Sequence, residues 1–266
     1  MDLEKILNEV ISLSKEAGAF IREERKKFKK EFIEFKGLND LVSYVDKEAE
    51  KILVKGLKKA LSEAGFITEE GTAKADNEEY KWIIDPLDGT TNFIHGLPIY
   101  AVSIGLVKGE EVILGVIYEI NRDECFYALE GGKAYCNGVE ISVSPTEKLE
   151  GCLIATGFPY YNFEKMQLYL EILDKFMQRT HGLRRMGSAA VDLAYVACGR
   201  FEGFFEYNLH PWDVAAGIII IKQAGGIVTD FQGHNNYLFG RQILAANKAH
   251  PEMLEVINKT WYSLKA

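Results

Sequence analysis

The sequence lacks the surplus of basic residues that nucleic-acid-binding proteins usually carry. Its 266 residues include 31 Lys and Arg against 39 Asp and Glu, which gives a formal net charge of −8 at pH 7. Affinity for a nucleic-acid backbone depends on Lys and Arg that neutralise phosphates, and no basic patch interleaved with aromatic residues is visible. We therefore expect no direct binding to nucleic acid, whereas a basic protein partner is compatible with this charge.

Cysteines and long apolar runs are also scarce. The chain has four cysteines and no CxxC pair, which argues against a disulfide framework or a four-cysteine zinc site and fits a reducing compartment. No apolar run reaches the roughly 20 residues that a membrane-spanning helix needs. The N-terminus, MDLEKILNEV, lacks the apolar block of a signal peptide. These absences predict a cytoplasmic protein without membrane contact.

Several motifs of common enzyme classes are missing as well. The chain contains no GxxxxGK, GxGxxG, HExxH or GxSxG sequence. Its five histidines show no spacing typical of metal ligands, so each is better interpreted as a loop or surface residue. We therefore expect no nucleotide-binding glycine-rich loop, no zinc-peptidase metal site and no serine-hydrolase nucleophile.

Hydrophobic periodicity divides the first half of the chain into helices followed by strands. Apolar residues at helical spacing predict one amphipathic helix over residues 3–21, capped by Asp2, and another that begins near Asp46. Short β-rich runs then follow between residues 80 and 143, separated by turn signals such as Asn137-Gly138. Consecutive strands with short turns predict an antiparallel sheet in this half.

The second half of the chain has a different pattern. After about residue 150, helices and strands alternate, which predicts a mixed or partly parallel sheet. The expected fold class is α/β (α+β), with two compact halves over residues 1–150 and 151–266. Ligand sites often lie between such halves, so we expect any shared site at their interface.

Three acidic clusters stand where apolar elements end. They lie in the segments FITEEGT, WIIDPLDGTTNF and HPWDVAAG, which contain Glu69 with Glu70, Asp85 with Asp88, and Asp213. A strand end or a helix start can aim a side chain from a rigid scaffold. The clusters are therefore candidates for one shared site.

The second cluster combines carboxylates with anion-binding backbone. Pro86 favours a tight turn, so Asp85 and Asp88 can converge on one point. Gly89 permits close approach of a ligand, and the predicted helix that follows offers free N–H groups at its first turn. A divalent cation would join the carboxylates to a phosphate, because Mg²⁺ prefers oxygen ligands of both kinds.

Plainer interpretations of these acids are also possible. The second cluster could be an acid-rich turn that caps a helix. A calcium-binding EF-hand is excluded, because the twelfth position counted from Asp85 is Gly96 and not Glu. Asp213 could be only a helix cap or a partner of the helix dipole. However, the helix predicted over residues 211–224 is almost entirely apolar between residues 214 and 221 and hence buried, which favours a functional role for an acid at its start.

Four segments of the chain resemble the inositol monophosphatase family of Mg²⁺-dependent phosphatases. In chain order they are EFIEFKGLNDLVSYVDKEAEKIL, WIIDPLDGTTNFIHGLP, RRMGSAAVDLAYVACGRFEGFFE and HPWDVAAGIIIIKQAGG, which match the family's metal loop, first signature, substrate-side segment and second signature. The resemblance covers nearly the whole chain. It implies a layered α/β/α/β/α sandwich, a homodimer and inhibition by Li⁺.

The resemblance implies ligands for two Mg²⁺ ions and a weaker third ion. One ion would be held by Glu69, Asp85 and the main-chain carbonyl of Leu87, and a second by Asp85, Asp88 and Asp213. The third would lie near Glu69. Two ions would cancel the charge of the four acids, so the net charge of the chain does not exclude a phosphate substrate.

The resemblance also implies which residues act on the substrate. The expected catalytic residues are Glu69, Thr90 and Asp88, of which the first two position and activate the attacking water. Gly89, Thr90 and Thr91 would hold the phosphate. The remaining substrate residues would face the alcohol or permit its close approach: Gly187, Ser188, Ala189, Glu206 and Asp213.

A few positions refine this expectation. Lys36 lies in a loop that would respond to metal occupancy, and Thr68 stands where the family often has Gly, a difference that would alter the flexibility of the acidic loop. Leu87 replaces a common Ile, with little effect expected because its carbonyl is the ligand. Thr91-Asn92-Phe93 resembles the inositol phosphatases more than the adenosine bisphosphate branch.

The expected function is hydrolysis of a small phosphate monoester, most simply myo-inositol monophosphate. Direct attack of water, with no covalent phosphoenzyme, predicts inversion at phosphorus, which a chiral-phosphate experiment measures. The alternatives are fructose-1,6-bisphosphatase activity, adenosine 3′,5′-bisphosphate hydrolysis and, outside enzymes, a role as a binding partner of the transcription machinery. The expected partner is therefore a small phosphorylated substrate.

Overall fold

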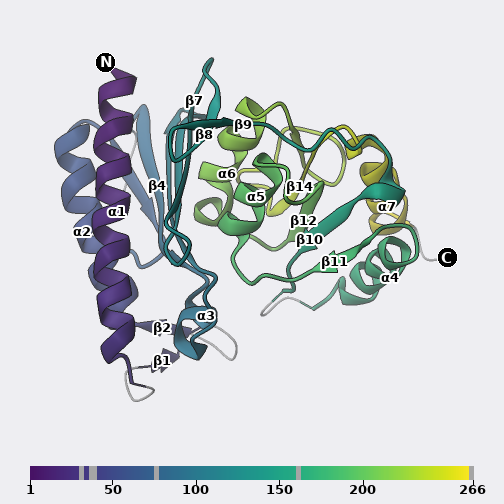
Figure 1. Cartoon of the computed structure of the whole chain (residues 1–266), viewed down its shortest axis with the longest axis horizontal. Coiled ribbons are helices and arrows are strands. Elements are labelled where there is room, and N and C mark those ends of the chain that lie inside the picture. The colour runs from purple at the N-terminus through teal and green to yellow at the C-terminus, as the bar shows by residue number, and fades with distance from the viewer. Residues whose placement is uncertain (30–32, 36–40, 75–77, 160–162, 264–266) are drawn as a thin grey trace.

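The computed structural model describes residues 1–29, 33–35, 41–74, 78–159 and 163–263, which form five stacked layers (Figure 1). Helices α1 (Leu3–Lys27) and α2 (Tyr44–Ala60) make one outer layer and pack on a seven-stranded sheet. Helices α5 (Ala189–Ala197) and α6 (Pro211–Gln223) fill the middle. A five-stranded sheet follows, and α4 (Met166–Met177) and α7 (His250–Trp261) form the second outer layer. The predicted α/β/α/β/α sandwich is therefore confirmed.

The first outer layer forms as its apolar periodicity predicts. Helix α1 (Leu3–Lys27) is capped by Asp2, whose carboxylate accepts a hydrogen bond of 3.0 Å from the backbone N–H of Lys5. Helix α2 (Tyr44–Ala60) begins two residues before the predicted Asp46, because Ser43 and Asp46 form a capping box. The apolar stripes of both helices are buried against the sheet.

The seven-stranded sheet follows the chain in order. Its strands are β3 (Gly65–Thr68), β4 (Tyr80–Asp88), β5 (Ala101–Lys108), β6 (Glu111–Glu119), β7 (Glu124–Leu129), β8 (Ala134–Cys136) and β9 (Val139–Ile141). All neighbouring pairs are antiparallel except β3 and β4, which are parallel. The antiparallel sheet predicted from the strands between residues 80 and 143 is confirmed. Strand β3, which is too short to be recognised in the sequence, adds one parallel pair at its edge. The parallel pairing brings the ends of β3 and β4, and hence Glu69 and Asp85, to the same edge of the sheet.

The five-stranded sheet is mixed, as predicted. Its order is β11 (Gly182–Arg184), β10 (Leu153–Thr156), β12 (Gly203–Tyr207), β14 (Gln242–Ala246) and β13 (Ile227–Thr229). The first three strands are parallel to one another, and the last two pairs are antiparallel. Helices α4 (Met166–Met177) and α7 (His250–Trp261) cover its outer face. The division of the chain into two domains near residue 150 stays a prediction.

The remaining elements are short. A two-stranded antiparallel ladder joins β1 (Ile33–Phe35) to β2 (Leu41–Ser43), the helix α3 (Thr90–His95) follows β4, and a 3-10 turn (Leu149–Gly151) precedes β10. None of the helices in the described ranges is long and apolar enough to span a membrane.

The two middle helices, α5 (Ala189–Ala197) and α6 (Pro211–Gln223), are buried between the sheets. Two glycines of the first sheet let α6 approach closely: a Cβ atom at Gly105 would lie 2.8 Å from the Cβ of Ala215, and one at Gly115 would overlap the Ala216 carbonyl. Ser103 of β5 also donates a hydrogen bond of 3.3 Å to the Trp212 carbonyl. This close packing places the first turn of α6, with Asp213, beside the end of β4.

Candidate metal centre and active site

A cavity of about 310 Å³ lies where the ends of β4 and β12 meet the starts of α3, α5 and α6. Its wall comes from residues 69–91 on one side and from residues 156–213 on the other. Every predicted site residue that the structure describes lines it: Glu69, Asp85, Leu87, Asp88, Gly89, Thr90, Thr91, Gly187, Ser188, Ala189, Glu206 and Asp213. Lys36 lies outside the described residues.

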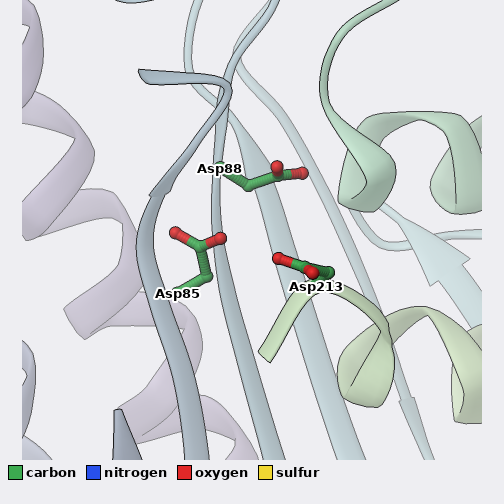
Figure 2. Close-up of side chains that lie close together, drawn as sticks. All are labelled: Asp85, Asp88 and Asp213. Carbon is green, nitrogen blue, oxygen red and sulfur yellow. The ribbon is translucent and has the colours of Figure 1, made fainter. Parts of the chain in front are cut away.

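Three carboxylates converge at the base of this cavity. Asp85, Asp88 and Asp213 each offer an oxygen atom within 4.8 Å of the other two, and Figure 2 shows their carboxyl groups facing one space. The register between β4 and β5 shifts between Asp85 and Asp88. Such an irregularity can re-aim side chains, so two acids three residues apart point to the same side. Glu69 lines the same cavity but is not one of these three.

The electrostatics of the three acids fit a bound cation. Burial, followed by the charges of Glu69, Asp88 and Asp213, raises the pKa of Asp85 well above its usual range. Burial raises the pKa of Asp88 to about 6, although hydrogen bonds from Ser188 and Ala190 oppose the shift. Burial and the charge of Asp88 raise the pKa of Asp213 to about 7. A hard divalent cation would relieve this repulsion through ligands that are all oxygen atoms.

Hydrogen bonds hold each of the three carboxylates in place. Asp88 Oδ2 accepts hydrogen bonds of 2.6 Å from both the Ser188 hydroxyl and the Ala190 backbone N–H. Asp213 Oδ2 accepts one of 2.6 Å from the His210 backbone N–H, and Asp85 Oδ1 accepts one of 2.9 Å from the Leu87 N–H. The site is therefore largely preorganised, and the Ser188 contact ties the two sides of the cavity together.

Thr90 has a partner that the sequence interpretation missed. Its hydroxyl lies 2.7 Å from Asp46 Oδ1 and 3.0 Å from the Leu87 carbonyl, and in both contacts it is the donor. Asp46 is buried and also accepts hydrogen bonds from the Ser43 backbone and hydroxyl. The capping-box pattern of Ser43 followed by Asp46 was the available signal for this residue.

Glu50 supports the loop that carries the first acidic cluster. Its carboxylate accepts hydrogen bonds of 2.8 Å from the Glu70 N–H, 2.9 Å from the Thr72 N–H and 2.7 Å from the Thr72 hydroxyl. Glu50 follows Asp46 by four residues, so both acids lie on the face of α2 that meets the site. The sequence interpretation gave Glu50 no role of its own, although Glu50 lies in the segment that resembles the family's metal loop.

Glycines bring the two sides of the cavity into contact. Gly89 and Gly187 have φ angles of 98° and 89°, which favour glycine. A Cβ atom at Gly89 would lie 3.3 Å from the Gly187 carbonyl, and one at Gly187 would lie 2.9 Å from Asn92 Nδ2. That amide of Asn92 donates hydrogen bonds of 2.8 Å to the carbonyls of Ile99 and Met186. Gly187 thus permits contact between the two walls.

Glu206 lines the cavity from the second sheet. It projects from β12, is 7% exposed and has a pKa well above its usual range, because it is buried and faces the charge of Asp213. Gly157 faces it directly, since any Cβ atom at that position would overlap the Glu206 carboxylate. Among the lining residues that had not been predicted are Phe158, Arg185 and Asp192.

Comparison with protein families and curated relatives places these residues in context. The model of the inositol monophosphatase family matches residues 2–264. "Nus factor SuhB" of Escherichia coli K12 is 44% identical over 214 residues, which cover 80% of each chain. The chloroplastic phosphatase IMPL1 of Arabidopsis thaliana is 40% identical over 268 residues, which cover 98% of this chain and 72% of the relative.

A solved structure agrees with these matches. The extragenic suppressor protein SuhB of Bartonella henselae superposes with a TM-score of 0.90 at 39% sequence identity, covering 96% of this chain and 98% of that one. The similarity therefore extends over the whole sandwich, including both walls of the cavity.

Proposed function

The chain belongs to the inositol monophosphatase family, and from this premise we propose that it hydrolyses a small phosphate monoester, most simply myo-inositol monophosphate, to the alcohol and inorganic phosphate. The observation that carries the proposal is the convergence of three buried or half-buried carboxylates in a cavity that also exposes the turn from Gly89 to Thr91. The name of the Arabidopsis relative, a phosphatase, supports the same activity.

The acids and one carbonyl supply a ligand set for divalent ions. Glu69, Asp85 and the Leu87 carbonyl would hold one Mg²⁺, and Asp85, Asp88 and Asp213 a second, with Glu69 near any third. When bound, such ions lower the pKa of a coordinated water and neutralise charge on the phosphate and on the leaving oxygen. All five residues line one cavity, and each of them presents an oxygen ligand.

The protein's own residues would orient the attacking water. The Thr90 hydroxyl has a single proton, which it donates to Asp46 or to the Leu87 carbonyl. Its oxygen lone pairs can therefore accept a hydrogen bond from a water in the cavity. The Glu69 carboxylate would take the second proton of that water as it attacks phosphorus. Asp46 thus acts as a positioning residue for Thr90.

Other residues would hold the two ends of the substrate. The backbone N–H groups of Gly89, Thr90 and Thr91 would donate to the phosphate oxygens. Ser188, Ala189 and Glu206 line the same cavity, and the alcohol would lie against them. Gly187 also lines the cavity, and its lack of a side chain would allow the alcohol to approach closely.

A phosphate-release panel tests the proposal. With Mg²⁺ present, we expect release from myo-inositol 1-phosphate and less from fructose 1,6-bisphosphate, adenosine 3′,5′-bisphosphate and glycerol phosphate. Added Li⁺ should inhibit the release. Chelation of the metal provides the matched control, because it removes the proposed ligand of the acids and leaves the chain intact. Absence of release from all four compounds would contradict a phosphatase function.

A second candidate function follows from the name of the Escherichia coli relative, a Nus factor. We propose that a protein-binding role in transcription can coexist with catalysis, since the chain is acidic and suits a basic partner. Immobilised protein should then retain RNA polymerase from a host lysate. The variant Asp88→Asn should retain as much, because partner binding would not need the metal centre. No polymerase above the blank-resin level would exclude this role.

A further inference from the structure

Asp192 is a cavity residue with no role in the proposed mechanism. It lies on α5, one turn after Ser188, and is 2% exposed. Its Oδ1 atom has no hydrogen-bond partner anywhere in the described part of the chain. Asp192 nevertheless lines the same cavity as the three converging carboxylates. It is therefore a buried polar group that faces the place where a ligand would bind.

Two other buried acids of this chain, Asp230 and Glu202, have hydrogen-bond partners. Asp230 is 8% exposed, and its Oδ1 accepts hydrogen bonds of 2.8 Å from the N–H groups of Gln232 and His234. Glu202 is 9% exposed and accepts one of 2.7 Å from the Leu153 N–H. A buried acid without partners is unfavourable, because the group loses its hydration and gains nothing in return. Asp192 differs from these two acids, because its Oδ1 atom has no partner in the described part of the chain and the residue lines the cavity.

The surroundings of Asp192 limit what can bind there. Burial, and then the charges of Glu206 and Asp88, raise the pKa of Asp192 well above its usual range, while Arg185 lowers it. An anionic group of a ligand would be repelled here by Asp192, Glu206 and Asp88. A hydroxyl group, in contrast, both donates and accepts, so it pairs with a carboxyl group in either protonation state.

We propose that Asp192 binds a hydroxyl group of the substrate's alcohol and is thereby a further specificity-determining residue of the site. The inference rests on the proposed phosphatase function and adds one residue to its substrate-binding part. A hydroxyl of the substrate supplies the hydrogen bond that Asp192 Oδ1 lacks within the described part of the chain.

The test compares the hydrolysis of two phosphate monoesters that have the same six-membered carbon ring. Myo-inositol 1-phosphate and cyclohexyl phosphate share a six-membered ring, but only the first carries free hydroxyls. For Asp192→Leu, we expect the ratio of kcat/KM for inositol 1-phosphate to that for cyclohexyl phosphate to fall about 10- to 100-fold relative to wild type. Asp192→Asn should recover part of this ratio, because its amide can still bond a hydroxyl.

Stability separates this role from a structural one. Without substrate, Asp192→Leu should melt at the same temperature as wild type or higher, because a buried carboxyl oxygen without a hydrogen-bond partner is removed. The matched control, Asp230→Leu, removes an acid that accepts hydrogen bonds from two backbone N–H groups, so it should melt lower and leave the substrate ratio unchanged. A structural role for Asp192 would instead lower the melting temperature and affect both substrates equally.

Each other outcome is decisive. An unchanged substrate ratio in both Asp192 variants, or an equal loss on both substrates, would overturn the assignment of Asp192 and leave the phosphatase function standing. If the wild type hydrolyses cyclohexyl phosphate but not inositol 1-phosphate, the assignment of Asp192 is likewise overturned. Wild-type inactivity on both compounds would contradict the proposed function itself and this inference with it.

Discussion

Asp88→Asn is expected to lower Mg²⁺-dependent phosphate release at least about 100-fold while the fold stays intact. Asp88 contributes one of the three oxygens that lie within 4.8 Å of one another. The amide has nearly the same shape but no charge, so it binds a divalent cation far more weakly. Its oxygen can still accept the hydrogen bonds that Ser188 and Ala190 donate to Asp88. The loss should therefore lie in turnover and not in folding.

The experiment measures kcat and KM over a range of Mg²⁺ concentrations, together with the melting temperature. Asp213→Asn should lower turnover to a similar extent, because the Asp213 carboxylate is the third member of the group. Asp174→Asn is the matched control, because Asp174 lies exposed on α4, away from the cavity. Without metal, Asp88→Asn should melt no lower than wild type, since one repelling charge is gone. Near-normal Mg²⁺-dependent turnover in either variant would show that the acid is not a metal ligand.

The local parts of this site could be predicted from the sequence. Asp85, Pro86, Asp88 and Gly89 lie within five residues, so turn chemistry alone brings the two acids together. The burial of Asp213 could likewise be inferred from the apolar helix behind it, which is confirmed by the buried residues of α6. The resemblance to a family then indicated that Asp213 and the acids of β4 belong to one site.

The non-local parts could not be predicted. The contact of Ser188 with Asp88 joins residues 100 positions apart, and that of Thr90 with Asp46 joins residues 44 apart. Such pairs depend on how α2 and α5 pack on the sheet, which no periodicity encodes. The parallel pairing of β3 with β4 was missed for the same reason, because its four residues carry too little pattern. Asp192 was not predicted as a site residue because a single acid in an otherwise apolar helix gives no pattern that points to a function.

The effect of Mg²⁺ on stability is expected to grow strongly with pH. In the metal-free fold, the pKa values of Asp88 and Asp213 rise from their ordinary value of 3.8 to about 6 and about 7. Groups with a raised pKa contribute stability below the unfolded value and lose it as pH rises through the folded values. Between about pH 4 and pH 7, the metal-free protein should therefore become less stable through these acids.

Mg²⁺ should reverse this trend because it binds the deprotonated acids. At pH 8, a concentration of 100 times Kd stabilises the fold by about 2.7 kcal/mol, which for a chain of this size raises the melting temperature by roughly 5–10 °C. At pH 5.5, protons compete for the same oxygens, so the shift should shrink to a small fraction of that value.

Thermal unfolding with Mg²⁺ and with a chelator, at pH 5.5 and pH 8, measures both effects. Asp213→Asn provides the matched control: it removes the acid whose pKa is about 7, so the metal-induced shift should be smaller and should depend less on pH. An equal shift at both pH values in the wild type would mean that Mg²⁺ binds elsewhere. If the metal-free protein instead gains stability from pH 5.5 to pH 8, the three carboxylates do not repel one another in the fold as their separation requires.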